Sequence, residues 1–297
     1  ILTQTDKPRG RSKTLVASDV AAVGDANNIK VYKSDKNTPE LIDELKKLNA
    51  DLFVVFAYGV ILKNEFLEIT KYGGINIHPS LLPLYRGASP MQSAILNGDK
   101  KSGITIQTVK LKVDSGDVLY QKEFDILDED DIFSVENRVS AMSSEAILEF
   151  LDKFEKKEIK GVSQNENNIT KCSMFKKEDG LIDWNESAKK NVNKIRAFAK
   201  WPVCFTFLDG KKLLIHKARI ADEINSKDFD KVSNGTIIEA SSKGGIVVKT
   251  GDSFVSLLKL QIEGKKSLDY KDFLNGHKNL KDKKFDNKQE VEDGKDH

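Results

Sequence analysis

The feature that most restricts the fold of this chain is the run DLFVVFA over residues 51–57, in which only the first residue is polar. A short, unbroken apolar run is typical of a strand that is buried on both faces in a parallel sheet. Further strand patterns occupy 74–78, 104–111 and 118–124, and helical patterns occupy 39–48, 89–96 and 132–154. This alternation of strands and helices predicts an open α/β domain with a mainly parallel sheet.

The second half of the chain has a different pattern. Residues 156–172 are polar and predict a linker. After a helix that Ser187 could cap, five or six short strand patterns with Gly turns indicate a small barrel or sandwich. Residues from Lys281 onward are charged, lack periodicity and predict a disordered tail. We therefore expect an α/β domain over 1–155, a linker over 156–172, a β domain over 173–280 and a tail over 281–297.

Composition narrows the class of protein. Of the 297 residues, 39% are apolar and 32% are charged, which is typical of a globular chain. No apolar run approaches the ~18 residues that a membrane-spanning helix needs. Two cysteines, Cys172 and Cys204, exclude a disulfide framework and a four-thiolate zinc site. A reducing, cytoplasmic setting is the default for such a sequence.

Charge is distributed unevenly along the chain. Residues 1–150 carry 18 basic and 22 acidic side chains, whereas residues 151–297 carry 30 and 24. The positive second half favours an anionic partner such as nucleic acid. The chain opens on Ile1, and its first four residues have the pattern of a strand end. We therefore expect that the natural N-terminus lies further upstream.

Asn76 and His78 form the first candidate catalytic pair. They lie two residues apart on one predicted strand, so both side chains project from the same face. Ligands of open α/β sheets bind beyond the carboxyl ends of the strands, where this pair would lie. An Asn amide and a His imidazole can together stabilise a developing oxyanion.

Two further motifs follow this pair. The first, PSLLPLYRGASP over residues 79–90, predicts a rigid and partly apolar loop that suits a buried planar ligand. The second, DSGD over residues 114–117, predicts a turn between two strands. A carboxylate there could orient His78 and stabilise its protonated form. From the residues alone, Asp114 and Asp117 are both candidates.

The combination of NIHPSLLP (residues 76–83), YRG (residues 85–87) and VDSGD (residues 113–117) resembles the 10-formyltetrahydrofolate-dependent formyltransferases. The resemblance implies a catalytic triad of Asn76, His78 and Asp114, which favours Asp114 over Asp117. It implies a folate site lined by the loop Ser80, Leu81, Leu82 and Pro83, with the segment Ala57, Tyr58 and Gly59 near the pterin. It also implies a Rossmann-like catalytic domain followed by a small OB-like β-barrel domain.

Within these formyltransferases, two features resemble the branch that acts on methionyl initiator tRNA. The segment TQTDKPRGRSK over residues 3–13 is similar to a basic loop that reaches the tRNA acceptor end. Lys7, Arg9, Arg11 and Lys13 are therefore candidate tRNA contacts, and a solvated surface loop is the alternative. The second feature is the carboxyl half, where KEDGLIDW (residues 177–184) and DFLNG (residues 272–276) resemble the start and end of that branch's C-terminal domain.

The resemblance implies transfer of the formyl group of 10-formyltetrahydrofolate to the α-amine of methionyl initiator tRNA, without a metal, by a monomeric cytoplasmic enzyme. Relative to that branch, the opening strand and its Gly-Thr-Pro loop, about 30 residues, are absent. One alternative is another folate-dependent formyltransferase, or a formyltetrahydrofolate hydrolase, on the same core. An alternative of a different class is a tRNA-binding module without catalysis.

Overall fold

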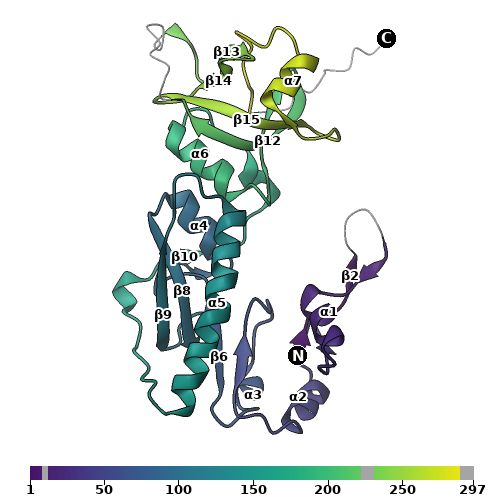
Figure 1. Ribbon diagram of the computed structural model, residues 1–297, viewed down its shortest axis with the longest axis vertical. Coiled ribbons are helices and arrows are strands. Elements are labelled where there is room, and N and C mark those ends of the chain that lie inside the picture. Colours follow the sequence, from purple (N-terminus) through teal and green to yellow (C-terminus); the bar gives the residue numbers. More distant parts are fainter. Residues whose placement is uncertain (9–12, 222–230, 288–297) are drawn as a thin grey trace, which may run out of the picture. The chain divides into compact units, whose positions relative to one another are not determined.

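The structure is a computed structural model that describes residues 1–8, 13–221 and 231–287. Figure 1 shows the arrangement of its elements. Its contacts divide the chain into two compact units. Unit 1 comprises residues 1–86, 104–122 and 143–170, and unit 2 comprises 87–103, 123–142 and 171–297. Each unit is described by itself.

The first half of the chain alternates short strands and helices as the sequence predicts. Its strands are β1 (Leu2–Thr3), β2 (Lys7–Pro8), β3 (Leu15–Val16), β4 (Tyr32–Lys33), β5 (Phe53–Val55), β6 (Gly74–His78), β7 (Arg86–Gly87), β8 (Lys101–Thr108) and β9 (Val118–Asp125). Its helices are α1 (Asp19–Ala26), α2 (Pro39–Lys46), α3 (Asn64–Leu67), α4 (Pro90–Asn97) and α5 (Ile132–Glu155).

A four-stranded sheet of order β5-β6-β8-β9 forms the centre of this half. The pairing of β5 with β6 is parallel, as expected, but β8 runs antiparallel to β6. The sheet is therefore mixed. The long helix α5 packs along β9, where the Tyr120 hydroxyl donates to Glu149 and Lys122 pairs with Glu145 (Figure 1).

The helices begin at residues whose side chains satisfy the free backbone N–H groups of the first turn. Ser18 accepts from the Ala21 backbone at the start of α1, and Thr38 accepts from Leu41 at the start of α2. Proline fills the first helical position of α2 and α4, where its missing N–H costs nothing. α4 then ends at Gly98, whose φ of 75° is a left-handed conformation that favours glycine.

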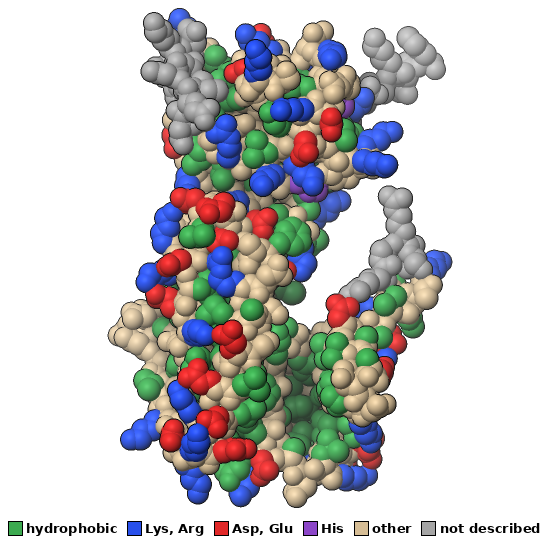
Figure 2. All heavy atoms as spheres, viewed as in Figure 1, with side chains coloured by type: hydrophobic (Ala, Val, Ile, Leu, Met, Phe, Trp, Pro, Cys, Tyr) green, Lys and Arg blue, Asp and Glu red, His purple; other side chains and the backbone are tan. Residues whose placement is uncertain are grey.

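The strand β5 is less buried than the apolar run around it predicts. Val54 is 45% exposed and Phe56 is 48% exposed. β5 lies at the edge of its sheet, because β1 and β4 form a separate parallel pair. Figure 2 shows apolar side chains at the surface of this N-terminal region. The expectation that both faces of this strand are buried is therefore wrong.

The second half contains the predicted series of β-strands. Its elements are β10 (Lys171–Cys172), α6 (Ala188–Ala197), β11 (Cys204–Leu208), β12 (Lys211–Ile220), β13 (Ile237–Ser241), β14 (Gly245–Lys249), β15 (Phe254–Ile262), β16 (Leu268–Asp269) and α7 (Tyr270–Gly276), with 3-10 turns at Glu166–Asn168 and Lys177–Gly180. The predicted cap of α6 is confirmed, since the Ser187 side chain accepts from the Lys190 backbone. The strands form an antiparallel sheet of order β11-β12-β15-β14-β13, with β16 beside β15.

The start of the expected tail belongs to the fold. Residues 281–287 are part of unit 2, where Phe285 is 3% exposed and stacks on Trp184 at a centroid distance of 5.4 Å. Backbone hydrogen bonds join Asp286 to Phe207 of β11, and Lys283 to Ile237 of β13. One buried aromatic ring and these backbone bonds order a segment whose charged composition predicts disorder. The rest of the expected tail, 288–297, lies outside the described residues.

Among the residues that the structure describes, no helix is long and apolar enough to cross a membrane.

Candidate active site

The strand β6 places the predicted pair Asn76 and His78 on one face of the unit 1 sheet. Across the antiparallel pairing with β8, Asn76 lies opposite Gln107 and His78 lies opposite Thr105. Directly opposed residues project to the same face, so these four polar side chains form one group. Asn76 is half-buried, whereas only 4% of His78 is exposed. The sheet thus brings the amide and the imidazole together as the sequence predicts.

Both ring nitrogens of His78 face a defined neighbour. Nε2 lies 2.9 Å from the backbone oxygen of Tyr85. Because a carbonyl oxygen can only accept, Nε2 carries the hydrogen and donates it. Nδ1 lies 3.5 Å from Oδ1 of Asp114. The imidazole is therefore held at one nitrogen, and the other faces the carboxylate.

Burial determines the charge of this histidine in the free protein. Loss of solvent lowers the pKa of His78 below its ordinary value, against the opposing attraction of Asp114 and the hydrogen bond to Tyr85. At neutral pH the ring is therefore neutral before a substrate binds. Its burial outweighs the single nearby carboxylate.

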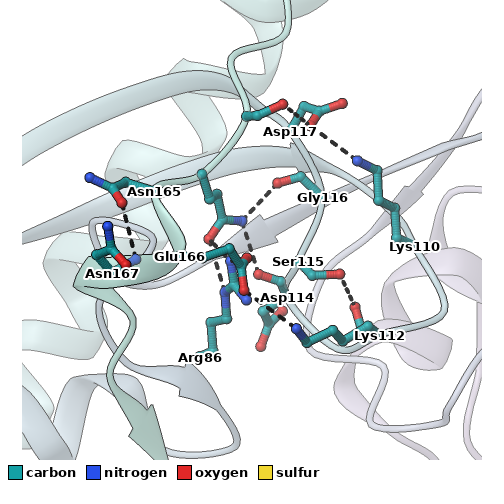
Figure 3. A network of polar contacts seen from close by, with 12 residues as sticks. Arg86, Lys110, Lys112, Asp114, Ser115, Gly116, Asp117, Asn165, Glu166 and Asn167 are labelled. Carbon is teal, nitrogen blue, oxygen red and sulfur yellow. Dashed lines mark hydrogen bonds and ion pairs between the residues drawn. The ribbon is translucent and has the colours of Figure 1, made fainter.

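The structure separates the two candidate carboxylates of the 114–117 turn. Asp114 faces His78, and 9% of its side chain is exposed. Asp117 instead pairs with Lys110 at 3.0 Å and accepts from Ser163 (Figure 3). Asp114 has a φ of 51°, a left-handed conformation that few residues other than glycine, Asn and Asp adopt. The turn therefore uses this backbone conformation to present Asp114 to the histidine.

Three residues around Asp114 were not among the sequence candidates. Gln107 donates from Nε2 to Oδ1 of Asp114 at 2.9 Å and accepts at Oε1 from the Gly116 backbone at 3.1 Å. Gln164 donates to the backbone oxygens of Asp114 and Gly116. The buried Arg86 donates from Nε and one terminal nitrogen to Oε1 of Gln164.

A signal for Gln107 exists in the sequence. In the strand pattern ITIQTV over residues 104–109, alternate positions place Thr105 and Gln107 on one face. Two polar residues on one face of a buried strand, beside the strand that carries Asn76 and His78, would have identified that face as part of the site. Gln164 gives no such signal, because its polar neighbours predict a linker. The structure instead packs this part of the expected linker against the site, where Val162 also forms a bridge to Val118.

The four residues of the predicted folate loop differ in how deeply they are buried. Ser80 is fully buried, and its hydroxyl donates to the backbone oxygen of Leu84 at 2.6 Å. Leu82 is also buried, and its backbone N–H donates to Thr105. Leu81 and Pro83 are half-buried and keep part of their surface open. Ser80 and Leu82 thus fix the shape of the loop, and Leu81 and Pro83 can meet a ligand.

The remaining candidates are the segment 57–59, expected near the pterin, and the basic segment 7–13. Ala57 and Gly59 are exposed and Tyr58 is half-buried, with its hydroxyl donating to the Ser34 backbone. Lys7 lies at the base of an antiparallel pair formed by β2 and β3, and Lys13 is exposed. Arg9 and Arg11 lie outside the described residues. Gln4 connects the two groups, because it donates to the Tyr58 backbone oxygen and accepts from Lys7.

Comparison with known proteins identifies the family of this chain. The profile of the family described as "Formyl transferase" matches residues 1–151, and that of "Formyl transferase, C-terminal domain" matches residues 174–278. A methionyl-tRNA formyltransferase of Borreliella afzelii is 42% identical over 280 residues, which are 94% of this chain and 88% of that protein. The chain belongs to the methionyl-tRNA formyltransferase family.

The protein is therefore an enzyme that transfers a one-carbon group. Other relatives have a similar sequence identity to it. A methionyl-tRNA formyltransferase of Borrelia hermsii is 41% identical over 285 residues, covering 96% of this chain and 91% of that one. Solved structures share its fold. One is an N-formyltransferase from Helicobacter canadensis, with a TM-score of 0.63, 19% identity and coverage of 85% of each chain. Another is HypX from Aquifex aeolicus in complex with tetrahydrofolic acid, with a TM-score of 0.61, 21% identity, and coverage of 84% of this chain and 43% of that one.

Proposed function

We propose that this formyltransferase transfers the formyl group of 10-formyltetrahydrofolate to the α-amine of methionyl initiator tRNA, for translation initiation. The observation that carries the proposal is the buried imidazole of His78, whose Nδ1 faces Asp114 while Asn76 projects from the same face of β6. The identity of about 41% to curated methionyl-tRNA formyltransferases supports the choice of substrates.

In this proposal Asn76, His78 and Asp114 are the catalytic residues. The folate supplies a formyl group that is already activated on nitrogen, so no metal is needed. When the amine attacks the formyl carbon, the carbonyl oxygen gains negative charge and the amine must lose a proton. The neutral His78 accepts that proton at Nδ1, and Asp114 stabilises the resulting imidazolium at 3.5 Å. Asn76 donates its amide hydrogen to the oxyanion. The histidine is thus neutral at rest and becomes cationic when the anion forms. The intermediate then collapses, the bond between the formyl carbon and the folate nitrogen breaks, and the imidazolium returns its proton to that nitrogen, so that tetrahydrofolate leaves.

The folate site in this proposal consists of the loop over 80–83 and the segment Ala57, Tyr58 and Gly59. Leu81 and Pro83 offer the partly open apolar surface that a pterin ring can contact. Ser80 and Leu82 act indirectly, through the internal contacts that hold the loop. Two of the four loop candidates are therefore proposed as ligand contacts, and two as supports.

The tRNA would contact the basic segment Lys7, Arg9, Arg11 and Lys13 and the C-terminal domain. We propose a catalytic domain and a C-terminal domain, which the matched family segments 1–151 and 174–278 support. The expected linker contributes Gln164 to the site of the first domain, and residues 282–286 belong to the fold of the second. We also propose that the C-terminal domain is an OB-like barrel. Its support is the segment 282–286, which makes backbone bonds to β11 and to β13, the two ends of the strand order. We further propose a monomer that acts in the cytoplasm, where initiator tRNA is used.

The test is a formyl-transfer assay that offers methionyl initiator tRNA, a nucleotide amino sugar and glycinamide ribonucleotide as acceptors, and that also measures free hydrolysis. We expect formylation of the tRNA alone, and a loss of about 10²-fold or more in rate for Asn76→Ala. Arg11→Ala should weaken tRNA binding and reduce its salt slope by about one, whereas Lys46→Ala, at an exposed helix end, should not. Formylation of another acceptor would favour the alternative formyltransferases. Tight tRNA binding without any transfer would favour the non-catalytic module.

A further inference from the structure

A chain of side-chain amides leads from a buried guanidinium to the carboxylate of Asp114. Arg86 donates to Oε1 of Gln164 at 2.8 and 3.0 Å. Gln164 donates from Nε2 to Oε1 of Gln107 at 3.3 Å, and Gln107 donates from Nε2 to Oδ1 of Asp114 at 2.9 Å. Figure 3 shows Arg86 and Asp114 in this network, together with Glu166, which Arg86 contacts at 3.0 Å. All of these residues lie in unit 1.

The orientation of each amide in this chain follows from its partners. A guanidinium only donates, so Gln164 must turn its oxygen towards Arg86 and its nitrogen towards the carbonyls of the turn. A backbone N–H also only donates, so Gln107 must turn its oxygen towards Gly116. The nitrogen of Gln107 then has to face Asp114. The backbone N–H of Gly116 and the amide of Gln164 both donate to Oε1 of Gln107. These two donors fix the orientation of the Gln107 amide, so that its nitrogen donates to Asp114.

We propose that Gln107 is a positioning residue that directs the carboxylate of Asp114 at His78 and anchors the 114–117 turn. One amide performs both tasks. Its nitrogen donates to the carboxylate of Asp114, and its oxygen accepts from the N–H of Gly116 two residues further along the same turn. The carboxylate is 9% exposed, so a donor from the protein replaces much of the hydration that burial removes. The inference rests on the proposed roles of His78 and Asp114.

The test compares two variants of Gln107 that separate these tasks. Gln107→Glu keeps an acceptor for Gly116 but places a second carboxylate beside Asp114. Two neighbouring carboxylates share a proton, so the activity of this variant should fall at alkaline pH and recover as the pH is lowered. Gln107→Met removes both bonds. It should lower kcat about tenfold or more at constant KM for both substrates, since it disturbs an interaction needed in the transition state.

Thr108→Val is the matched control. Thr108 follows Gln107 on β8, and its hydroxyl accepts from the Asp117 backbone at 2.9 Å, so it anchors the same turn through a different residue. If Gln107 only anchored the turn, Thr108→Val would resemble Gln107→Met, and Gln107→Glu would keep the parental pH profile. That result would overturn the inference. Urea unfolding of each variant monitors folding, and Gln107→Glu alone carries the test if Gln107→Met does not fold.

Asp114→Asn distinguishes failure of the inference from failure of the proposed function. If Asp114→Asn is inactive while both Gln107 variants keep the parental kcat and pH profile, only the role of Gln107 is refuted. If Asp114→Asn keeps full activity, the catalytic roles proposed for Asp114 and His78 are refuted, and the role of Gln107 with them. A shifted pH profile for Gln107→Glu together with an inactive Asp114→Asn supports both.

Discussion

His78 combines two opposing influences in one side chain. Burial favours the neutral ring, whereas Asp114 favours the charged one, and burial prevails. A base that is neutral at rest and has a carboxylate beside its free nitrogen is ready to accept a proton and to hold it. The same balance has a consequence for the stability of the protein, because it changes how many protons the folded state binds.

The first prediction concerns pH and stability. The pKa of His78 is lowered in the folded protein from an unfolded value of about 6.5. Below that unfolded value the unfolded chain binds a proton that the folded chain still excludes, so this residue destabilises the protein as the pH falls. Between pH 7 and pH 5, the free energy of unfolding should fall less in His78→Gln than in the parent. Urea unfolding at both pH values measures this difference, and equal losses would contradict it.

The second prediction concerns space at the turn. A Cβ added at Gly116 would lie 1.6 Å from the backbone oxygen of Thr108, so an alanine cannot fit without moving the turn. Gly116→Ala should therefore displace Asp114 from His78 and lower kcat by about tenfold or more. Gly276→Ala is the control, because nothing lies within 4 Å of its Cβ position. Equal activity of the two variants would mean that the turn has an alternative conformation that preserves the site.

At the scale of whole elements, the segment 282–286 shows how little is needed to order a charged stretch of chain. The third prediction is that Phe285→Ala lowers the free energy of unfolding of unit 2 by about 3–5 kcal/mol, because it removes a buried aromatic ring. Phe133→Ala should cost much less, since Phe133 is 46% exposed at the start of α5. Calorimetry of the two variants provides the comparison. Similar losses would show that the stacking on Trp184 contributes little.

The elements that the sequence predicts well are those whose signals are local. β6 has the predicted limits, α4 begins within one residue of the predicted start, and Ser187 caps α6. Each depends on side chains within a few residues of one another. The antiparallel direction of β8 and the exposure of Val54 depend on which strand lies beside which, and neither is encoded within one segment.

The candidate site divides in the same way. The sequence predicts Asn76 and His78 from their spacing, and the family resemblance selects Asp114. The amides of Gln107 and Gln164 are missed because they come from a strand and from an expected linker, 57 residues apart, and meet only in the folded chain. The lowered pKa of His78 could not be predicted from the sequence, because it depends on a burial that no neighbour in the sequence reveals.

At the scale of the whole molecule, the two units differ in how they are assembled from the chain. Unit 1 consists of three separate stretches, and its site draws on all of them: His78 from the first, Asp114 from the second and Gln164 from the third. A structural change in any one of these stretches can therefore displace a residue of the site. Most of unit 2 is one stretch from residue 171 onward, together with two shorter insertions.

The segment 282–286, which bonds to both end strands of the unit 2 sheet, could also be supplied as a separate peptide. A chain that stops at Lys278 would retain β11 and β13 with their free edges, and a synthetic peptide of residues 279–287 carries every backbone group that Phe207 and Ile237 bind. We expect the peptide to associate with the shortened chain and to restore its native fluorescence, because Phe285 returns to its place on Trp184. A peptide with Phe285→Ala should bind much more weakly, and equal binding of the two peptides would contradict the expectation. Recovery of the fluorescence would then report that the two fragments have assembled.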